Sequence, residues 1–321
     1  MIQRTILALA FASIATIGSA VAARADDTVS VSSGQKGAWD QMIVQQGIDQ
    51  GFFKKEHLDI KLSYTSGGPD TIQAVATGGA DVGMGVGTTA VIAAFTKGAP
   101  VKIGAASFTG QNDVFLYTKA ESSIKSFADM NGKSVGFSRP GSSTFIFEHV
   151  LAAQDKVQPN FVSAGDMAAN LTQVMSGQLD AGWAVPPFNL DLISQKKLRI
   201  IARGKDAREI ANQTVRVDIV NTNFARDHRD VDVRFWRAYR TTLDWMYKNT
   251  NASIAAFAKY NDIPINVARD AFAFYPKSAV QAYPVAEFNK SVEDAITYKF
   301  ITKPLDADQS KAIFDIVFDH R

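Results

Sequence analysis

The sequence has no cysteine and only four histidines among its 321 residues. Without cysteine the chain can form no disulfide and carry no lipid-modified cysteine, so we expect a freely diffusing protein. His57, His149, His228 and His320 are scattered without the spacing of metal ligands. No G-x-S-x-G, H-E-x-x-H or C-x-x-C motif occurs either. We therefore expect no metal and no cofactor.

The chain also lacks a large excess of either charge. Its formal net charge is +2, and loss of residues 1–25 would remove Arg4 and Arg24 and leave a neutral protein. A neutral domain has no overall field that attracts nucleic acid or anionic lipid. We expect no nucleic-acid partner.

Long apolar runs are missing after the N-terminus. The first residues carry one early cation, Arg4, then an apolar run from Ile6 to Ile17 and the triplet Ala23-Arg24-Ala25. This layout predicts a secretory signal over residues 1–25, cleaved near Ala25. The alternative is a membrane anchor, but the run is shorter than the roughly 20 residues that a span needs. We expect the periplasm of a double-membraned bacterium.

Strand-like and helix-like segments alternate along the rest of the chain. Thr28–Ser33 alternates apolar and polar residues, and so does the stretch that begins at Leu58. Gly/Pro-rich breaks and helical patterns separate such strands. This alternation predicts an α/β fold with parallel strands. From about Asp230 the pattern becomes helical. An aromatic stripe there is assigned to packing, and its members are Val233, Trp236, Tyr239, Leu243 and Met246.

Two stretches of the chain match in outline. Residues 69–86 read PDTIQAVATGGADVGMGV, and residues 168–185 read AANLTQVMSGQLDAGWAV. Four positions coincide at one constant offset: Gly78, Asp81, Gly83 and Val86 fall on Gly177, Asp180, Gly182 and Val185. Because both copies occupy the same place in a strand–helix pattern, we predict two lobes of similar architecture.

A glycine-rich stretch, Gly83-x-Gly85-x-Gly87, precedes Thr88 and Thr89 at the start of a helical pattern. A dinucleotide fingerprint needs G-x-G-x-x-G and an acid about 20 residues later, and both are missing. Free backbone N–H groups at this helix start can hold a small polar or anionic group. The alternative is that Thr88 or Thr89 only caps the helix.

These stretches together resemble the exported substrate-binding proteins of ABC importers of the nitrate/sulfonate/taurine type. The resemblance is carried by QGFFKKEHLDIKLSYTSGGPDTIQAVATGGADVGMG, SFADMNGKSVGFSRPGSSTFIFEHVLAAQ and VMSGQLDAGWAVPPF. It implies a type II periplasmic-binding fold with two α/β lobes and a ligand cleft between them. The implied first lobe spans residues 26–112, the second 113–214, and residues 215–321 return to the first lobe and add helices. The implied partners are a small-molecule ligand, a membrane permease and its ATPase. We expect a monomer.

The resemblance also implies a set of ligand-binding residues, carried over by position. They are Lys36, Trp39, Ser66, Gly67, Thr88, Thr89, Phe108, Thr109, Arg139, Ser142, Ser143, Thr144, Trp183 and Pro186. Other interpretations remain open for some of them: Lys36 as a solvated cation, Arg139 as an anchor of its own turn, and the tryptophans as core.

The family resemblance includes one departure. Many relatives have an acid where this chain has Pro186, and such an acid could pair with an amine of the ligand. With Lys36 and Arg139 facing the cleft, the pocket would be cationic, and we expect a ligand with an anionic group, an apolar or aromatic body and no amine. The alternative is that another acid, such as Asp113 or Asp166, enters the cleft.

Two enzymatic functions compete with solute binding. The same lobe architecture occurs in enzymes that make the thiamin pyrimidine, but those rely on histidines, and the predicted cleft loops contain none. A secreted hydrolase could use Ser142 or Ser143 as a nucleophile, but no paired base is evident in the sequence.

Overall fold

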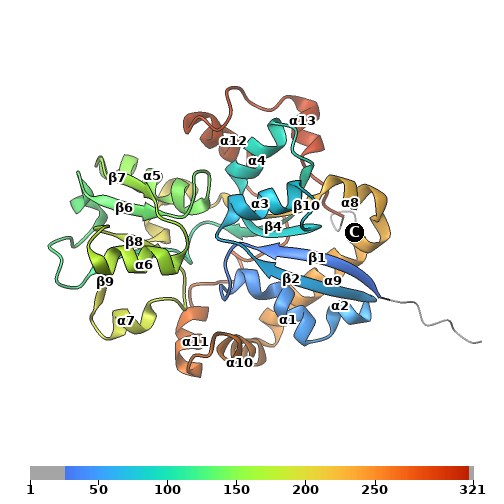
Figure 1. Ribbon diagram of the computed structural model, residues 1–321, viewed down its shortest axis with the longest axis horizontal. Coiled ribbons are helices and arrows are strands. Elements are labelled where there is room, and N and C mark those ends of the chain that lie inside the picture. Colours follow the sequence, from blue (N-terminus) through green and yellow to red (C-terminus); the bar gives the residue numbers. More distant parts are fainter. Residues whose placement is uncertain (1–25, 318–321) are drawn as a thin grey trace, which may run out of the picture.

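The computed structural model describes residues 26–317, which form two α/β lobes side by side (Figure 1). The predicted signal at residues 1–25 lies outside the described residues. No helix in the described part of the chain has the length and apolar character needed to cross a membrane.

The first lobe is built on a five-stranded sheet with the order β2-β1-β3-β10-β4. β1 runs parallel to β2 and β3, whereas β10 is antiparallel to β3 and β4. Its strands are β1 Asp27–Ser33, β2 Leu58–Tyr64, β3 Val82–Gly87, β4 Val101–Thr109 and β10 Thr214–Asn221. Its helices before β10 are α1 Ile43–Asp49, α2 Phe52–Lys55, α3 Gly68–Ala76 and α4 Thr88–Thr96, with a 3-10 turn at Asp40–Met42.

The second lobe repeats this order. β8 and β9 flank β5 antiparallel, β6 and β7 pair in parallel, and a bridge from Val135 to Ala181 joins the two groups. The resulting order is β7-β6-β8-β5-β9. Its elements are β5 Phe115–Lys119, β6 Ser134–Phe137, α5 Ser143–Asp155, β7 Asn160–Ser163, α6 Met167–Ser176, β8 Gly182–Ala184, α7 Leu190–Ser194 and β9 Leu198–Arg203.

The same hydrogen-bonded Asp–Ser pair, called a staple below, occurs in both sheets at the position where the sequence repeats. The Asp81 carboxylate accepts hydrogen bonds from the backbone N–H of Ser30 at 2.8 Å and from its hydroxyl at 2.6 Å. In the second lobe Asp180 does the same for Ser134, at 2.8 and 2.9 Å. The repeated Asp therefore ties the start of the strand after each helix to a neighbouring strand, β3 to β1 in the first lobe and β8 to β6 in the second.

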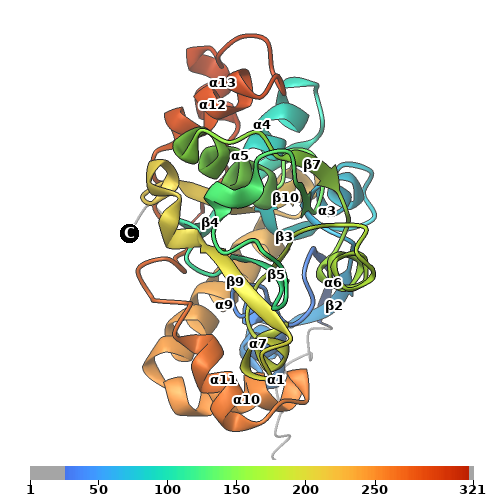
Figure 2. The ribbon, with the colours of Figure 1, turned by 90° about the vertical axis from the view of Figure 1, so that its left-hand side faces the viewer.

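The C-terminal part of the chain adds helices to the first lobe. They are α8 Thr222–Asp227, α9 Arg229–Lys248, α10 Thr250–Asn261, α11 Ile265–Phe272, α12 Phe288–Thr297 and α13 Ala307–Ala312. α10 and α11 lie on one side of the molecule, and α12 and α13 on the opposite side (Figures 1 and 2). Within α9 the predicted stripe packs into the first-lobe core, with Val233 half-buried and the other four members buried.

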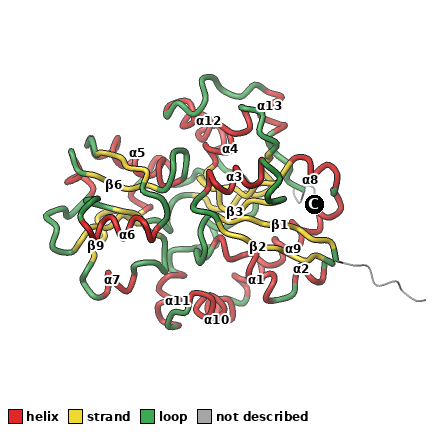
Figure 3. Tube along the Cα trace, in the orientation of Figure 1, coloured by secondary structure: helices red, strands yellow, loops and turns green. Residues whose placement is uncertain are grey.

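Two connections join the sheets, from β4 to β5 and from β9 to β10. Figure 3 shows the strands of the two lobes as separate groups with loops between them. β10 thus enters the first-lobe sheet only after the chain has built the second lobe. The lobes also touch directly: the Thr89 hydroxyl donates to the carbonyl of Gly141 at 3.1 Å. Tyr275, which follows α11, donates to the carbonyl of Pro186 at 2.7 Å. The exact lobe boundaries stay a prediction.

Candidate ligand-binding site

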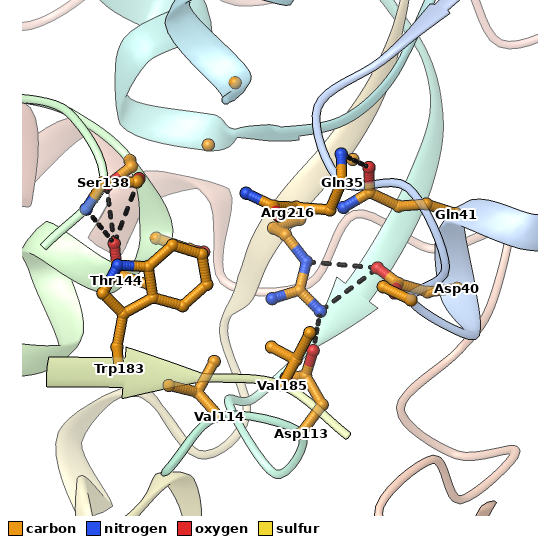
Figure 4. A pocket seen from close by; sticks show the side chains of 16 residues that line it. Gln35, Asp40, Gln41, Asp113, Val114, Ser138, Thr144, Trp183, Val185 and Arg216 are labelled. Atoms are coloured by element: carbon orange, nitrogen blue, oxygen red, sulfur yellow. Dashed lines mark hydrogen bonds and ion pairs between the residues drawn. The ribbon is translucent and has the colours of Figure 1, made fainter. Parts of the chain in front are cut away.

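A small pocket lies where the two lobes meet (Figure 4). The centre of a water-sized sphere can occupy about 30 Å³ of it. The first lobe contributes Gln35, Ala38, Asp40, Gln41, Gly68, Gly85, Gly87 and Arg216, the connection Asp113 and Val114, and the second lobe Ser138, Ser142, Ser143, Thr144, Trp183 and Val185. With these residues around it, the pocket is closed over by both lobes.

The glycine-rich strand β3 allows backbones to approach the pocket closely. A Cβ on Gly87 would lie 2.5 Å from the carbonyl oxygen of Gly141 in the other lobe. Gly85 has a φ of +64°, and a Cβ there would lie 2.7 Å from the amide carbon of Gln41. These glycines are needed for close contact within the first lobe and between the lobes. All three glycines of the Gly83-x-Gly85-x-Gly87 stretch lie within β3.

A serine and threonine network frames the second-lobe side. Ser142 caps α5 by accepting a hydrogen bond from the backbone N–H of Phe145 at 3.2 Å. Thr144 lies 2.9 Å from the Ser142 hydroxyl and accepts from the backbone N–H of Ser138 at 3.1 Å. Ser143 makes no hydrogen bond through its hydroxyl to any other described residue, and its side chain lines the pocket. The N-terminus of α5 therefore points hydrogen-bond donors and a positive dipole end at the pocket.

A buried ion cluster forms the first-lobe side. Arg216, on β10, donates from Nη2 to Asp113 at 2.5 Å and from Nε to Asp40 at 3.2 Å. Its guanidinium also lies 4.4 Å from the centre of the Phe108 ring. All three charged side chains are nearly inaccessible to solvent.

Burial shifts the pKa values of this cluster. Burial raises the pKa of Asp113 to about 6, although the Arg216 charge opposes the shift; the Asp40 charge adds to it. Burial would lower the pKa of Arg216, but the two carboxylates outweigh it and raise this pKa above its ordinary value. Arg216 is thus a permanent cation between two carboxylates.

A third buried acid, Asp218, supports the strand β3 that lines the pocket. Asp218, two residues further on β10, accepts a hydrogen bond from the backbone N–H of Gly85 at 2.7 Å. Burial raises its pKa to about 7. Asp218 therefore fixes the turn of β3 that carries Gly85 without facing the pocket itself.

Four of the predicted site residues line the pocket: Ser142, Ser143, Thr144 and Trp183. Gly67 and Thr88 directly adjoin the lining residues Gly68 and Gly87, and Pro186 follows the lining residue Val185. Three others lie near the meeting of the lobes. Phe108 supports Arg216, Thr109 pairs with the Thr214 hydroxyl at 2.9 Å, and Thr89 bonds to Gly141. Ser66 is exposed to solvent. Whether these residues bind a ligand stays a prediction.

Trp39 does not line the pocket, contrary to our expectation. Its side chain is fully buried among the rings of Phe257 and Phe272, at 5.2 and 4.7 Å between centroids. The chain turns after β1 so that Trp39 faces the helices α10 and α11, while the next residue, Asp40, faces the pocket. The core interpretation is therefore correct for Trp39.

The two predicted cleft cations also lie outside the lining. Lys36 sits 5.9 and 5.8 Å from the ring centres of Tyr64 and Tyr260. Arg139 bonds to the carbonyl of Ser138 at 3.2 Å and lies 3.9 Å from the Asp70 carboxylate. The cation that lines the pocket is instead Arg216, and it is paired there with two acids, Asp40 and Asp113.

Sequence reasoning missed Arg216 and Asp40 and gave Asp113 only as an alternative. One signal was present: Arg216 and Asp218 interrupt an otherwise apolar run, TVRVDIVN, that reads as a buried strand. A charge in a strand buried along its whole length requires a partner or a function.

Comparisons with known proteins agree with this architecture. The family model described as NMT1/THI5 like matches residues 42–253. No curated protein matches the chain. Its fold resembles that of a Candida albicans protein described as having the generic periplasmic binding protein fold, with a TM-score of 0.74 and 14% identity over 90% of this chain and 96% of that one.

Two bacterial binding proteins are also similar. The alkanesulfonate-binding protein SsuA from Xanthomonas axonopodis pv. citri, solved with MOPS, gives a TM-score of 0.72 and 18% identity over 89% of this chain and 99% of that one. The nitrate-binding protein NrtA from Synechocystis PCC 6803 gives a TM-score of 0.69 and 12% identity over 90% of this chain and 85% of that one.

The two-lobed architecture and these matches show that the chain has the type II periplasmic-binding-protein fold. Among proteins of this fold, the chain belongs to the NMT1/THI5-like family, and the resemblance to the nitrate/sulfonate/taurine type is confirmed.

Proposed function

We propose that this protein captures a small organic solute with an anionic group between its lobes in the periplasm and delivers it to the permease and ATPase of an ABC importer. One observation carries the proposal: the pocket is lined by both lobes, and the glycine Gly87 permits their direct contact. A site that exists only when two lobes meet fits a protein that traps its ligand by closing.

The helix starts around the pocket favour an anionic group. Gly68 begins α3, Gly87 precedes α4, and Ser142 to Thr144 begin α5. Each N-terminus stabilises an anion by about 0.3–1 kcal/mol, and by up to about 2 kcal/mol when partly buried. Micromolar binding needs about 8 kcal/mol, so no single loop is sufficient. Micromolar binding therefore requires the summed free energy of ligand contacts from both lobes.

The chemistry of the pocket gives less support to the enzymatic alternatives. None of the sixteen lining residues is a histidine. Ser142 is engaged as a helix cap, and the nearest histidine along α5, His149, stacks on Phe161 at 3.9 Å between ring centres. Ser143 therefore has no histidine within the lining to activate it as a hydrolase nucleophile, and the two lining carboxylates, Asp40 and Asp113, are both paired with Arg216.

The test combines ligand discovery with a measurement of closure. Native mass spectrometry of the purified protein should detect a co-purified small molecule. Small-angle scattering should then show a smaller radius of gyration with that molecule than after its removal. Gly87→Val should abolish the change, because its side chain would collide with Gly141, whereas Thr77→Val, at an exposed position after α3, should keep it. Turnover of the molecule, or an unchanged radius in the wild type, would contradict the proposal.

A further inference from the structure

An aromatic cluster outside the pocket bridges the two lobes. Tyr298 and Phe300 follow α12 of the first lobe, and Phe145 lies in the first turn of α5 of the second. The ring of Phe145 meets those of Tyr298 and Phe300 edge to face, at 5.5 and 5.4 Å between centroids. His149, one turn further along α5, packs on Phe145 at 3.9 Å and lies 5.2 Å from Tyr298. These four residues, called the aromatic latch below, join the end of α12 to α5 in the upper half of Figure 2.

The first lobe anchors its half of the latch. The backbone N–H groups of Phe300 and Ile301 both donate to the carbonyl of Ala295, at 2.8 and 3.2 Å, which closes the end of α12. Lys299 turns the chain there with a φ of +62°. Ile301 is buried in the core of the first lobe. Phe300, in contrast, packs against the cores of both lobes, and Tyr298 packs against the core of the second. The turn after α12 therefore belongs to one lobe and presents two rings to the other.

The latch contacts the same helix that lines the pocket. Ser142 to Thr144 line the pocket, and Phe145 is the next residue of α5. Gly141, just before the helix, accepts a hydrogen bond from Thr89 through its carbonyl, and a Cβ built on it would lie 3.7 Å from the ring of Phe300. The N-terminal end of α5 therefore touches the first lobe at two places, α4 and the turn after α12, in the arrangement in which both lobes close over the pocket.

We infer that Tyr298 and Phe300 are positioning residues, which stabilise the closed arrangement of the lobes and thereby set the affinity of the pocket from outside it. Separation of the lobes would pull Phe145 away from both rings and expose their apolar faces to water. Each aromatic pair of this geometry favours its associated state by about two- to tenfold. The two pairs therefore shift the ligand-free protein toward closure.

The latch affects binding through the population of closed lobes. The apparent Kd of a ligand equals its intrinsic Kd divided by the fraction of protein in the binding-competent state. A larger closed fraction therefore tightens the binding of any solute that the pocket takes. This inference rests on the proposed solute capture, and it adds a control on affinity that makes no contact with the solute.

A purely structural role for these rings makes a different prediction. Phe288 and Phe314 form an edge-to-face pair at 4.8 Å, but both pack against the core of the first lobe. Phe314→Ala therefore removes a comparable contact within one lobe. If Tyr298 and Phe300 only stabilised the fold, their loss and the loss of Phe314 would act alike, lowering the Tm without changing the spacing of the lobes. A latch should change the spacing as well.

The spacing can be measured directly because the chain has no cysteine of its own. Spin labels on Gln73→Cys in α3 and Thr172→Cys in α6, both exposed positions, report the distance between the lobes by double electron–electron resonance. The ligand-free full chain should show two distances, the shorter one matching this structure. Tyr298→Ala combined with Phe300→Ala should lower the ratio of the short to the long distance by about fivefold or more. Phe314→Ala and the ring-preserving Tyr298→Phe should leave the ratio within about twofold.

Several results would overturn the inference. They are an unchanged ratio in the double variant, a shift toward the short distance, an equal shift in Phe314→Ala, or a ligand-free wild type without the short distance. Phe145→Leu removes the facing ring from the second lobe and decides the question if the double variant does not fold. It should lower the ratio too, and an unchanged ratio there would equally contradict the latch.

The outcome for the latch is separate from the outcome for solute capture. With the co-purified molecule as the probe, calorimetry should give a Kd that rises in the latch variants by up to the factor found for the ratio. A lowered ratio in a protein that binds no solute would support the contact between the lobes and remove the proposed capture. Closure around the co-purified molecule, with an unchanged ratio in the latch variants, would leave the capture standing while the inference fails.

Discussion

The two lobes share a frame, down to the staples Asp81–Ser30 and Asp180–Ser134, but they bring different chemistry to the pocket. The first lobe and the connection supply a buried cation and two acids. The second lobe supplies hydroxyl groups, an indole and a helix start, all uncharged. The repeated architecture therefore determines where the edges of the two sheets meet, while the residues at each edge differ between the lobes and can contact different groups of a ligand. The predictions below probe this division.

The largest effect should come from removing the buried cation. Arg216→Met leaves Asp40 and Asp113 buried without their partner, and we expect a loss of about 3–5 kcal/mol in the free energy of unfolding. Urea denaturation followed by circular dichroism measures it. The matched variant in the second lobe, Arg139→Met, disrupts a half-exposed pair and should cost less than about 1 kcal/mol. Equal losses would contradict the contrast between the lobes.

Asp218 should make the stability of the protein depend on pH. Its pKa lies near 7 in the folded protein, mainly through burial, and near 3.8 when unconstrained. The folded state therefore holds a proton between these values that the unfolded state has lost, and this stabilisation disappears as the pH rises through 7.

Between pH 5.5 and 8, the free energy of unfolding should fall by on the order of 2 kcal/mol from this group. Asp218→Asn keeps an acceptor for Gly85 and should reduce the fall, whereas Asp244→Asn, an exposed residue, should not. A pH dependence that is the same in wild type and Asp218→Asn would refute the assignment.

The staples should be equivalent in energy. Asp81→Ala and Asp180→Ala each remove a carboxylate that accepts two short hydrogen bonds from a serine. Each substitution should lower the free energy of unfolding by about 1.5–3 kcal/mol, measured by the same urea titration. If one substitution left the free energy of unfolding unchanged while the other lowered it, the two staples would have the same geometry but different contributions to stability.

The smallest effect is spectroscopic. Trp183 lines the pocket, whereas Trp39 lies in the core of the first lobe. Ligand binding should therefore change the fluorescence of Trp183, and Trp183→Phe should remove most of that change. Trp39→Phe serves as the control and should retain it. A signal that vanishes with Trp39 instead would place the ligand elsewhere.

Local patterns were sufficient to predict much of the fold. The alternation of strands and helices, and four positions from Gly78 to Val86 that recur 99 residues later, predicted two α/β lobes. The predicted residues Ser142 to Thr144, at the start of α5, do lie at the pocket. Such features depend on neighbours in the sequence. Arg216 and Asp40 are separated by 176 residues, and only the insertion of β10 between β3 and β4 brings them together. Trp39 and Asp40 point to opposite sides through one local turn, which composition cannot indicate.

The strand order has a consequence for the assembly of the chain during synthesis. β10 lies between β3 and β4, yet it follows the whole second lobe in the sequence. Until residue 221 has been added, β3 and β4 each expose an unpaired edge, and the buried carboxylates Asp40 and Asp113 lack Arg216. Exposed edges are sites of wrong pairing between chains. We therefore expect a nascent or truncated chain that ends before Thr214 to aggregate more readily than the full chain, since the first lobe, although it starts first, is completed last.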